Sequence, residues 1–316
     1  MTEKRKLGNS NLHISSIGLG VMQFAGGKGM FRTIFNHFGQ EVKDRIVRAA
    51  LDGGINWFDT AEIYGYGRSE KTLRDALVNN QVRDEDVLIA SKWWPFPRFA
   101  NNIRRTAGKR LANLSPYTLD LHQVHWPHSF SSPEAQMDAM ADLVEGGRIR
   151  AVGVSNFNEE YTYRAHNALA KRGLGLASNQ VQFSLVHREI EHNGVLKAAK
   201  ELGVTIIAWS PLASGLLSGK FHKDQEILAN TPATRRRRLA AQLERTQPLI
   251  EVLDELAHRH DKSITQVVLN WTIHFHGDTV AAIPGASQVK HAREAAGVLD
   301  FRLTDAEMAK LDEISR

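Results

Sequence analysis

The sequence of 316 residues contains no cysteine. This absence excludes disulfides, thiolate metal ligands, iron–sulfur clusters and a cysteine nucleophile. The sequence also lacks any run of the roughly eighteen apolar residues that a membrane-spanning helix needs. Its first six residues are mostly polar or charged and have none of the apolar stretch typical of a signal peptide. We therefore expect a cytoplasmic protein that does not contact a membrane.

An excess of charge of one sign is almost missing as well. The chain has 40 Lys and Arg residues against 35 Asp and Glu, a formal net charge of +5. Such a balance leaves room for one locally basic site rather than a basic face. An anionic small molecule fits this charge as well as nucleic acid does, but the sequence shows no motif of a known nucleic-acid-binding module. We therefore expect no nucleic-acid partner.

Short apolar runs alternate with helical patterns along the chain, whose apolar fraction of 42% suffices for a large core. The apolar runs, predicted as strands, lie at 17–19, 55–58, 87–90, 119–124, 151–154, 178–181, 204–208 and 279–283. The helical patterns lie at 41–51, 69–78, 102–114, 133–145, 159–171, 193–202, 249–258 and 289–298. Eight such units indicate parallel strands joined by helical crossovers. Since no Gly-x-Gly-x-x-Gly follows the first strand and no strand reads as a sheet edge, we predict an α/β fold, a closed (β/α)8 TIM barrel in one domain over 1–316.

Further elements lie outside this repeat. The segments 4–7 and 12–15 flank Gly-Asn-Ser-Asn and predict an N-terminal β-hairpin. Capping-box patterns that begin at Ser263 and Thr304 predict two extra helices.

Two insertions, 24–40 and 221–245, follow the first and seventh predicted strands. Barrel enzymes keep their sites at the face where these insertions lie, so both are candidate lids. The second insertion contains four consecutive arginines, Arg235 to Arg238. Such a run is often solvated, and the segment 239–243 after it is compatible with a helix extension. A lid that folds over a bound anion is the other interpretation, and the sequence leaves both open.

The stretch 53–70 carries the first candidate chemistry. Its apolar run 55–58 ends in Asp59, and a glycine-punctuated turn with Tyr64 then leads to Ser69, a candidate cap for the next helix. Taken alone, the carboxylate is compatible with a turn cap and the phenol with a half-buried aromatic. Their importance depends on whether other polar groups converge on the same place.

Lys92 and His125 end the next two predicted strands. In a closed barrel the carboxyl ends of successive strands converge, so these side chains would meet Asp59 and Tyr64 at one mouth. A tyrosine has a pKa of about 10 and is a poor proton donor or acceptor at neutral pH. A nearby ammonium, held by a carboxylate, favours the phenolate. We therefore predict Tyr64 as a general acid and base that Lys92 and Asp59 tune, and His125 as a hydrogen-bond donor to a substrate oxygen.

These residues stand in motifs that resemble the aldo-keto reductase family. Phe-Asp-Thr-Ala-Glu-Ile-Tyr-Gly at 58–65 is similar to the family signature around its catalytic Asp and Tyr. Ser91-Lys92 and Gln123-Val-His125-Trp-Pro resemble the segments of its catalytic lysine and histidine. Further similar segments follow in order at 153–157, 179–182, 209–220 and 283–286. The resemblance runs from about residue 5 to the C-terminus.

The resemblance implies a barrel that binds an extended NADPH and passes a hydride between its nicotinamide and a carbonyl carbon. Asp59, Tyr64, Lys92 and His125 would form the catalytic tetrad, with Tyr64 protonating the nascent alkoxide. The implied partner is a small-molecule carbonyl compound. The sequence does not indicate the oligomeric state.

The resemblance also implies a set of cofactor contacts. Ser155, Asn156 and Gln180 would hold the nicotinamide carboxamide, and Trp209 would stack on its ring. The Gly- and Ser-rich segment 210–220 would let main-chain amides approach the pyrophosphate. Taken alone, Trp209 is compatible with a core residue, and Ser155 with Asn156 is compatible with a helix cap. The expected cofactor residues are Val21, Met22, Asp59, Ser155, Asn156, Gln180, Trp209, Ser210, Pro211, Leu212, Ser214, Gly215, Lys220, Ser287, His291 and Glu294.

The segment after 283–286 departs from the family pattern at one position. Ala295 stands where an asparagine is expected at the adenosine, so the adenine contact is lost or rearranged. Lys290, Arg293 or an arginine of the run 235–238 would supply charge for the ribose 2′-phosphate. We therefore expect NADPH as the cofactor, with NADH possible.

Apolar and aromatic side chains follow several predicted strands. The candidate walls of a substrate pocket are Phe24, Met30, Phe31, Phe35, Trp93, Trp94 and Trp126. Their character suggests an aldehyde or ketone with hydrophobic or aromatic bulk rather than a free sugar. We expect no metal site, because His122 and His125 point to opposite faces of a strand and no carboxylate spacing completes a zinc site with His128.

Two other function classes stay open. Potassium-channel beta subunits resemble this family and bind NADPH while serving as partners of a membrane protein, so a regulatory subunit on the same scaffold is the alternative. An isomerase or lyase at the same mouth would need a phosphate or metal site that the sequence does not show. The presence of all four tetrad residues favours the enzyme.

Overall fold

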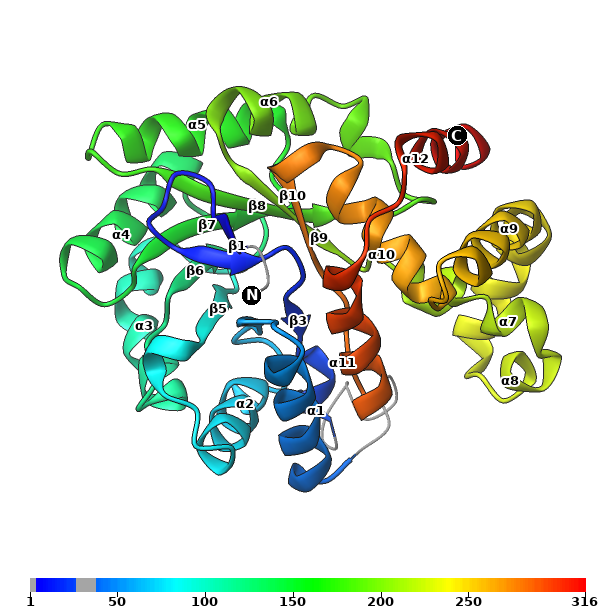
Figure 1. Ribbon diagram of the computed structural model, residues 1–316. Coiled ribbons are helices and arrows are strands. Elements are labelled where there is room, and N and C mark those ends of the chain that lie inside the picture. Colours follow the sequence, from blue (N-terminus) through cyan, green and yellow to red (C-terminus); the bar gives the residue numbers. More distant parts are fainter. Residues whose placement is uncertain (1–3, 27–37) are drawn as a thin grey trace.

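The computed structural model describes residues 4–26 and 38–316. Eight parallel strands form one sheet in chain order. The strands are β3 (Leu19–Gly20), β4 (Trp57–Asp59), β5 (Leu88–Trp93), β6 (Leu121–Val124), β7 (Ala151–Ser155), β8 (Leu176–Gln182), β9 (Thr205–Trp209) and β10 (Val280–Ile283). The sheet closes where Ile17, just before β3, pairs with Ala282, and where Gly20, at the end of β3, pairs with Gly285. All eight predicted strands are present, and the fold is the predicted TIM barrel (Figure 1).

Helices alternate with the strands and surround the sheet (Figure 1). They are α1 (Gln40–Asp52), α2 (Arg68–Asn79), α3 (Asn101–Leu114), α4 (Pro133–Glu145), α5 (Glu159–Ala170), α6 (Val195–Leu202), α10 (Ile264–His274) and α11 (Val289–Ala296). Each presents an apolar side to the sheet, as helical spacing predicts. In α3, for example, Ile103, Ala107 and Leu114 are buried. No helix within residues 4–26 and 38–316 is both long and apolar enough to cross a membrane.

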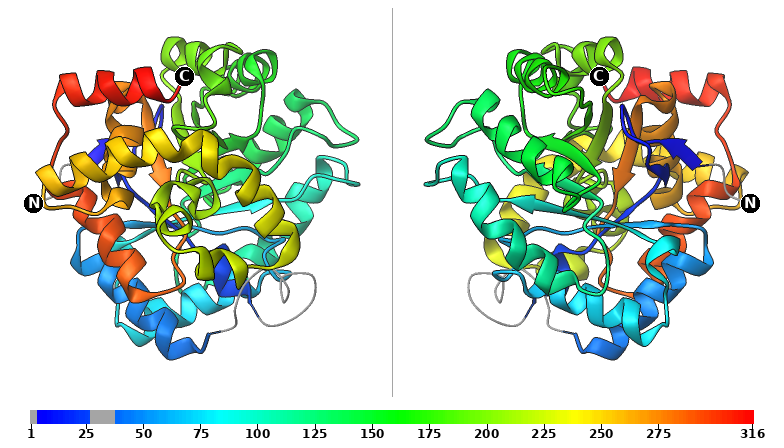
Figure 2. Two further views of the ribbon diagram at one scale, coloured as in Figure 1. Left: turned by 90° about the vertical axis from the view of Figure 1, so that its right-hand side faces the viewer. Right: turned by 90° about the vertical axis from the view of Figure 1, so that its left-hand side faces the viewer.

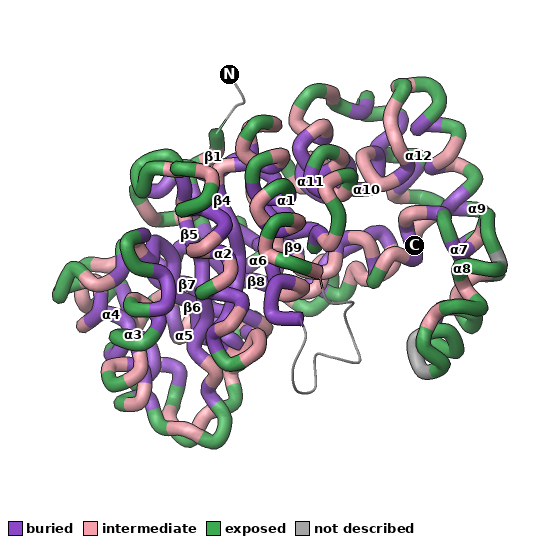
Figure 3. The backbone as a smooth tube through the Cα atoms, turned by 90° about the horizontal axis from the view of Figure 1, so that it is seen from below, coloured by how far each residue is buried: buried purple, intermediate pink, exposed green. Residues whose placement is uncertain are grey.

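A hairpin of β1 (Lys4–Lys6) and β2 (His13–Ser15) confirms the predicted N-terminal hairpin. Leu7 and Leu12, from the turn between the two strands, share a buried cluster with Trp57 inside the barrel. A second and larger cluster fills the space between the sheet and the helices, so the strands are buried on both faces (Figure 3). The hairpin plugs the end of the barrel where the strands begin, which leaves their carboxyl ends for a site.

The connection from β9 to β10 is helical rather than a loop. The insertion 221–245 forms most of α7 (Lys220–Lys223), all of α8 (Gln225–Ala229) and the first half of α9 (Ala233–Arg259). The arginine run therefore lies in a helix, and the apolar residues after it extend that helix.

The helix α10 takes the place of a barrel helix, although we expected it outside the ring. It packs against β10 and α11, whereas α9 packs on α10 and α12 (Asp305–Ile314) at the outside of the molecule (Figure 2). The placement of 249–258 in the ring was therefore wrong. The reason is burial, because residues around most of α10, including Val267 and Trp271, are buried and need neighbours on two sides. The extra helices are α9 and α12.

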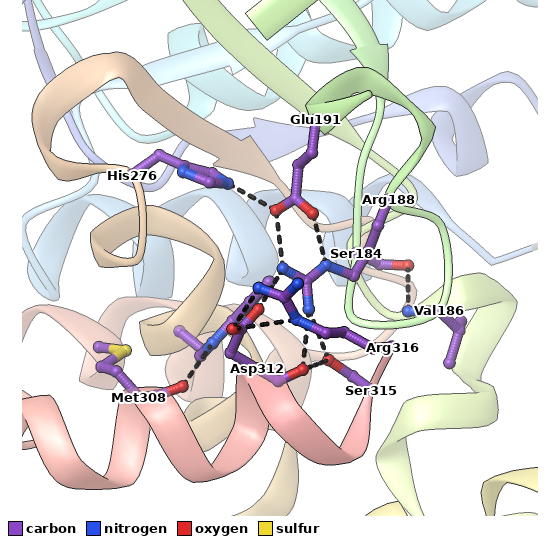
Figure 4. Close-up of polar contacts among 10 residues, drawn as sticks. Ser184, Val186, Arg188, Glu191, His276, Met308, Asp312, Ser315 and Arg316 are labelled. Atoms are coloured by element: carbon purple, nitrogen blue, oxygen red, sulfur yellow. Dashed lines mark hydrogen bonds and ion pairs between the residues drawn. The ribbon is translucent and has the colours of Figure 1, made fainter. Parts of the chain in front are cut away.

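The C-terminal helix α12 is tied to the rest of the fold by Arg188 (Figure 4). The guanidinium of Arg188 donates to the carboxylates of Glu191 and Asp312. It also donates to the Asp312 carbonyl and to the Ser315 hydroxyl. Its carbon centre lies 5.1 Å from the ring centroid of Trp271 in α10. One buried cation thus joins the segment after β8, the helix α10 and the end of the chain.

Candidate active site

The predicted catalytic residues lie together at the carboxyl ends of β4, β5 and β6. Lys92 Nζ donates to Asp59 Oδ1 at 2.5 Å and to the Thr60 carbonyl at 2.9 Å. Asp59 stands beside Ala90 of the neighbouring strand, two residues before Lys92, so both side chains point into the barrel. Only 3% of the Asp59 side chain and none of the Lys92 side chain is exposed. The two charges therefore form a buried ion pair beneath the mouth.

Two glutamine amides hold the other oxygen of Asp59. Gln180 and Gln123 donate from Nε2 to Asp59 Oδ2 at 2.9 and 3.2 Å. Gly153 leaves room for them, since a Cβ at this position would lie 2.9 Å from Gln123 Cγ. Sequence reasoning missed Gln123 as a site residue. Its position two residues before His125, hence on the same side of a strand, was the signal that could have found it.

Tyr64 lies in the turn after β4, between Lys92 and His125. The Lys92 ammonium is 5.4 Å from the centroid of the Tyr64 ring, which stands edge-on to the His125 ring at 5.8 Å between centroids. Burial raises the pKa of Tyr64 above its usual value, and the charge of Asp59 raises it further. The expected effect of Lys92, which favours the phenolate, does not reverse this shift of the Tyr64 pKa. The phenol is held protonated, which is the form that can donate a proton.

The surroundings of His125 favour a neutral imidazole. Burial lowers its pKa well below the usual value, and the charge of Lys92 acts in the same direction. Its Nδ1 is buried and has no hydrogen-bond partner within the described part of the chain. The His125 ring packs edge-on against the Trp94 ring, with 5.3 Å between centroids. Trp94, a predicted pocket residue, therefore lies at the site. A neutral imidazole carries one N–H that it can donate to a ligand oxygen.

Ser155, Asn156 and Trp209 form a hydrogen-bonded group beside the tetrad. Asn156 Oδ1 accepts from Trp209 Nε1 at 3.1 Å, and Asn156 Nδ2 donates to the His125 carbonyl at 3.1 Å and to Ser155 Oγ at 3.0 Å. The φ of Asn156 is 61°, a strained backbone state that clusters at functional sites. The alternative of a helix cap fails, because Asn158 caps α5. Trp209 is only half-buried and therefore lies at the rim of the core.

The segment 210–215 has an unusual backbone. Ser210, Ala213 and Ser214 have left-handed φ values of 55°, 47° and 58°. Successive residues in such turns direct main-chain N–H groups to one concave side, which suits a phosphate. Arg238 of α9 donates from Nη2 to Ser214 Oγ at 3.3 Å, so one arginine of the run reaches this segment. The other predicted residues here are Pro211, which is buried, and Leu212 and Gly215, which are half-buried.

The two lysines Lys220 and Lys290 lie near His291 at the start of α11. Burial lowers the pKa of His291, and the nearby charges of Lys220 and Lys290 lower it further. The main-chain N–H of Ser287 donates to His291 Nδ1 at 3.4 Å. Lys290 lies 3.8 Å from Glu294. Together with the turn at 210–215, this cluster fits the phosphates of a dinucleotide.

Three other positions are occupied by main-chain or packing contacts. Val21 is buried, and its N–H donates to the Asp59 carbonyl at 2.9 Å. Met22 is half-buried and begins a short 3-10 helix. Ala295, where an asparagine was expected, is 1% exposed and packs in the main core. A small side chain at 295 therefore serves the packing of α11.

Trp93 and Phe24 do not line a pocket, so these two predictions were wrong. Trp93 is fully buried and donates from Nε1 to Asn102 Oδ1 of α3 at 3.0 Å. Since side chains alternate along β5, Trp93 points outward where Lys92 points into the barrel. Phe24 is also fully buried, with its ring edge-on to Phe38.

The remaining predicted wall residues differ in position. Trp126 follows His125 directly and is 38% exposed. Met30, Phe31 and Phe35 lie outside the described residues. Sequence reasoning missed an exposed aromatic cluster in the loops after β5 and β6, in which the Phe130 ring lies 5.7 Å from Phe96 and 5.3 Å from Phe99 between centroids.

Ser69 does not cap α2, contrary to our expectation. The helix begins at Arg68 after Gly67, and no side chain caps it. The hydroxyl of Ser69 instead donates to the Val21 carbonyl at 2.7 Å, which ties the start of α2 to the segment after β3. This hydrogen bond fixes the C-terminal end of the turn that carries Tyr64.

No group of three or more His, Asp or Glu side chains in the described ranges is arranged to hold a metal ion. His122, one of the three spaced histidines, lies with Nδ1 at 3.3 Å from the Ser91 carbonyl.

Comparison with known proteins gives relatives along nearly the whole chain. Residues 16–316 match the model of the aldo/keto reductase family. A chloroplastic pyridoxal reductase of Arabidopsis thaliana is 33% identical over 280 residues, which cover 83% of this chain and 73% of the relative. The methylglyoxal reductase YeaE of Escherichia coli is 32% identical over 267 residues, which cover 84% and 82%.

Solved structures agree with these matches. A thermostable aldo-keto reductase in complex with the inhibitor epalrestat superposes with a TM-score of 0.78 at 29% identity, covering 99% of each chain. The eight-stranded barrel is therefore also the fold of a solved aldo-keto reductase. On a family match that spans almost all of its residues, this chain belongs to the aldo/keto reductase family.

Proposed function

We propose that this protein reduces an aldehyde or ketone to an alcohol with NADPH, and that Tyr64 is the proton donor. One observation carries the proposal: the Tyr64 ring lies between the Lys92 ammonium and the His125 ring, above the buried ion pair of Lys92 with Asp59. The reductase names of both relatives support it.

The cofactor would supply a hydride to the carbonyl carbon. His125 donates its N–H to the carbonyl oxygen and stabilises the charge that develops there. Tyr64 gives its proton to the same oxygen as a general acid. Lys92, whose ammonium lies near the Tyr64 ring, stabilises the phenolate that remains, and Asp59 holds Lys92 in place. In the oxidative direction the phenolate takes the proton back.

The proposal of NADPH rests on the cluster of Lys220, Lys290 and His291. These groups suit the ribose 2′-phosphate, which NADH lacks, and Arg238 would add charge beside the pyrophosphate. Fluorescence titration tests the preference: NADPH should bind more tightly than NADH, and Lys220→Ala should narrow the difference. Equal affinity of the unaltered protein for both would contradict it.

For the substrate we propose a carbonyl compound with hydrophobic or aromatic bulk. Trp94 packs on His125, and Trp126 lies partly exposed next to it. One relative is named for pyridoxal, an aromatic aldehyde, and another for methylglyoxal, which is small. A panel of aryl aldehydes and free sugars tests the proposal, and much faster turnover of the sugars would remove it.

The decisive experiment follows the loss of NADPH absorbance with a generic aromatic aldehyde. Tyr64→Phe should lower kcat by at least about 100-fold, because it removes only the proton donor, while NADPH affinity stays unchanged. Tyr66→Phe is the matched control, since Tyr66 lies in the same turn but is 85% exposed. If the unaltered protein binds NADPH but turns over no carbonyl, the alternative of a regulatory binding subunit replaces this proposal.

A further inference from the structure

A buried ionic network adjoins the turn that carries Tyr64. Glu62, two residues before Tyr64, is 6% exposed. Its Oε2 accepts from Arg110 Nη1 at 2.8 Å, and its Oε1 accepts from Arg98. Arg110 comes from α3 and has only 5% of its side chain exposed, whereas Arg98 lies in the loop after β5 with 35% exposed. The turn is therefore bound to a rigid helix and to a loop at the rim.

The same guanidinium reaches the helix that follows the turn. Arg110 Nε lies 3.0 Å from Glu70 Oε2 in α2. Glu70 is fully buried, and it accepts from Ser91 Oγ and from Asn113 Nδ2, both at 2.7 Å. Since Ser91 precedes Lys92 in β5, the network links the turn before Tyr64, the helix after it and the strand of Lys92.

Gly67, at the end of the turn, packs closely against Asn113 and Arg110 of this network. A Cβ at Gly67 would lie 2.5 Å from Asn113 Nδ2 and 3.2 Å from Arg110 Nη2. Its φ of 86° is a conformation that glycine adopts without strain. The segment with Tyr64 is thus held at Glu62 on one side and by close packing at Gly67 on the other.

A buried ion pair is by itself weak support for stability, because desolvation offsets much of the attraction. Such a pair can still fix the geometry of a catalytic turn, and that geometry matters because a proton donor must lie within hydrogen-bond reach of its acceptor. Small displacements there cost large factors in rate. We propose that Glu62 and Arg110 are positioning residues that hold Tyr64 at the distance needed for proton transfer. This inference rests on the proposed function of Tyr64.

Glu62→Gln tests the inference, because it keeps the shape of the side chain and removes its charge. We expect kcat to fall at least about 10-fold, with KM for the carbonyl and the affinity for NADPH within about twofold. The solvent deuterium isotope effect on kcat should rise, since proton transfer from a displaced Tyr64 becomes slower. Arg110→Lys keeps the positive charge but cannot contact Glu62 and Glu70 with two separate nitrogens. Its kcat should lie between those of Glu62→Gln and the unaltered protein.

Glu191→Gln is the matched control. Glu191 has only 10% of its side chain exposed and is also paired with an arginine, Arg188, but it belongs to the contacts that attach the C-terminal helix. It should lower thermal stability about as much as Glu62→Gln and leave kcat and the isotope effect unchanged. If both variants lower kcat equally, or if Glu62→Gln keeps kcat within about twofold of the unaltered protein, the inference is wrong.

Amide hydrogen exchange of residues 63–67 provides a readout that does not need turnover. Exchange there should be faster in Glu62→Gln than in the unaltered protein and unchanged in Glu191→Gln. If the unaltered protein shows no carbonyl turnover, the proposed function is wrong. If the amide exchange of residues 63–67 is equal in all three proteins, the positioning role of Glu62 is wrong. Where Glu62→Gln does not fold, Arg98→Ala tests the partly exposed arm and should lower kcat about threefold. An unchanged kcat and unchanged exchange in that variant count against the inference.

Discussion

Single residues of the site owe their protonation states to burial. Desolvation disfavours the charged form of each group, so it raises the pKa of Tyr64 and lowers that of His125. Burial also lowers the pKa of Lys92, and the charge of Asp59 and the hydrogen bond to it oppose this shift. The result is one ion pair between two neutral groups, a proton donor and a hydrogen-bond donor.

The neutral state of His125 predicts a flat pH dependence. Since its pKa lies well below the usual value of about 6.5, the imidazole stays neutral between pH 6 and 8 and protonates only at lower pH. At saturating NADPH, kcat/KM for the carbonyl should therefore change less than about twofold across this range. A pH profile checks this. A step near pH 6.5 that disappears in His125→Asn would show that the histidine is charged in the working range.

At the scale of elements, the starts of α10 and α12 follow local chemistry closely. Both predicted capping boxes are confirmed, with Ser263 paired to Gln266 in α10 and Thr304 paired to Glu307 in α12. Each needs only residues three positions apart, which explains why sequence patterns reveal them.

The box at α12 predicts an acid-sensitive contact. Burial opposes ionisation of Glu307, but hydrogen bonds from Thr304, His260 and Arg259 outweigh it and lower the pKa of Glu307 to about 2. The folded-state pKa is depressed, so this stabilisation is present above about pH 4.5 and is lost as the pH falls toward 2. Exchange of the α12 amides should accelerate over that window. Glu307→Gln keeps a capping side chain without the charge, and it should remove the pH dependence; a dependence that persists would assign it to another group.

For the whole molecule, the attachment of α12 depends on Arg188. Arg188→Ala takes one guanidinium away from the carboxylates of Glu191 and Asp312, which keep their contacts with His276 and Arg316, and it opens space beside Trp271. We expect a loss of about 3 kcal/mol in the free energy of unfolding, because breaking a buried pair strands its partner. Urea denaturation measures it.

Arg316→Ala provides the control for this prediction. Arg316 also contacts Asp312, but 67% of its side chain is exposed, and exposed pairs contribute at most about 1 kcal/mol (Figure 4). Equal losses in both variants would mean that contact with Asp312, rather than the buried position of Arg188, decides the attachment.

The sequence by itself determined the barrel and the meeting of Asp59, Lys92 and His125 at its mouth. Strand and helix patterns depend on neighbours within a few positions, and Asp59, Lys92 and His125 each stand within one residue of the end of such a strand. Because the ends of parallel strands converge in any closed barrel, their meeting followed from local patterns alone. The positions of these three residues therefore needed no knowledge of packing.

Only the tertiary structure decided how the groups are buried and which distant residues they meet. Trp93 points outward, α10 lies in the ring, and the phenol of Tyr64 is held protonated. The contact of Glu62 with Arg110 joins residues 48 positions apart. Such outcomes depend on the solvent that packing removes and on partners brought from elsewhere in the chain, and no local pattern encodes either of them.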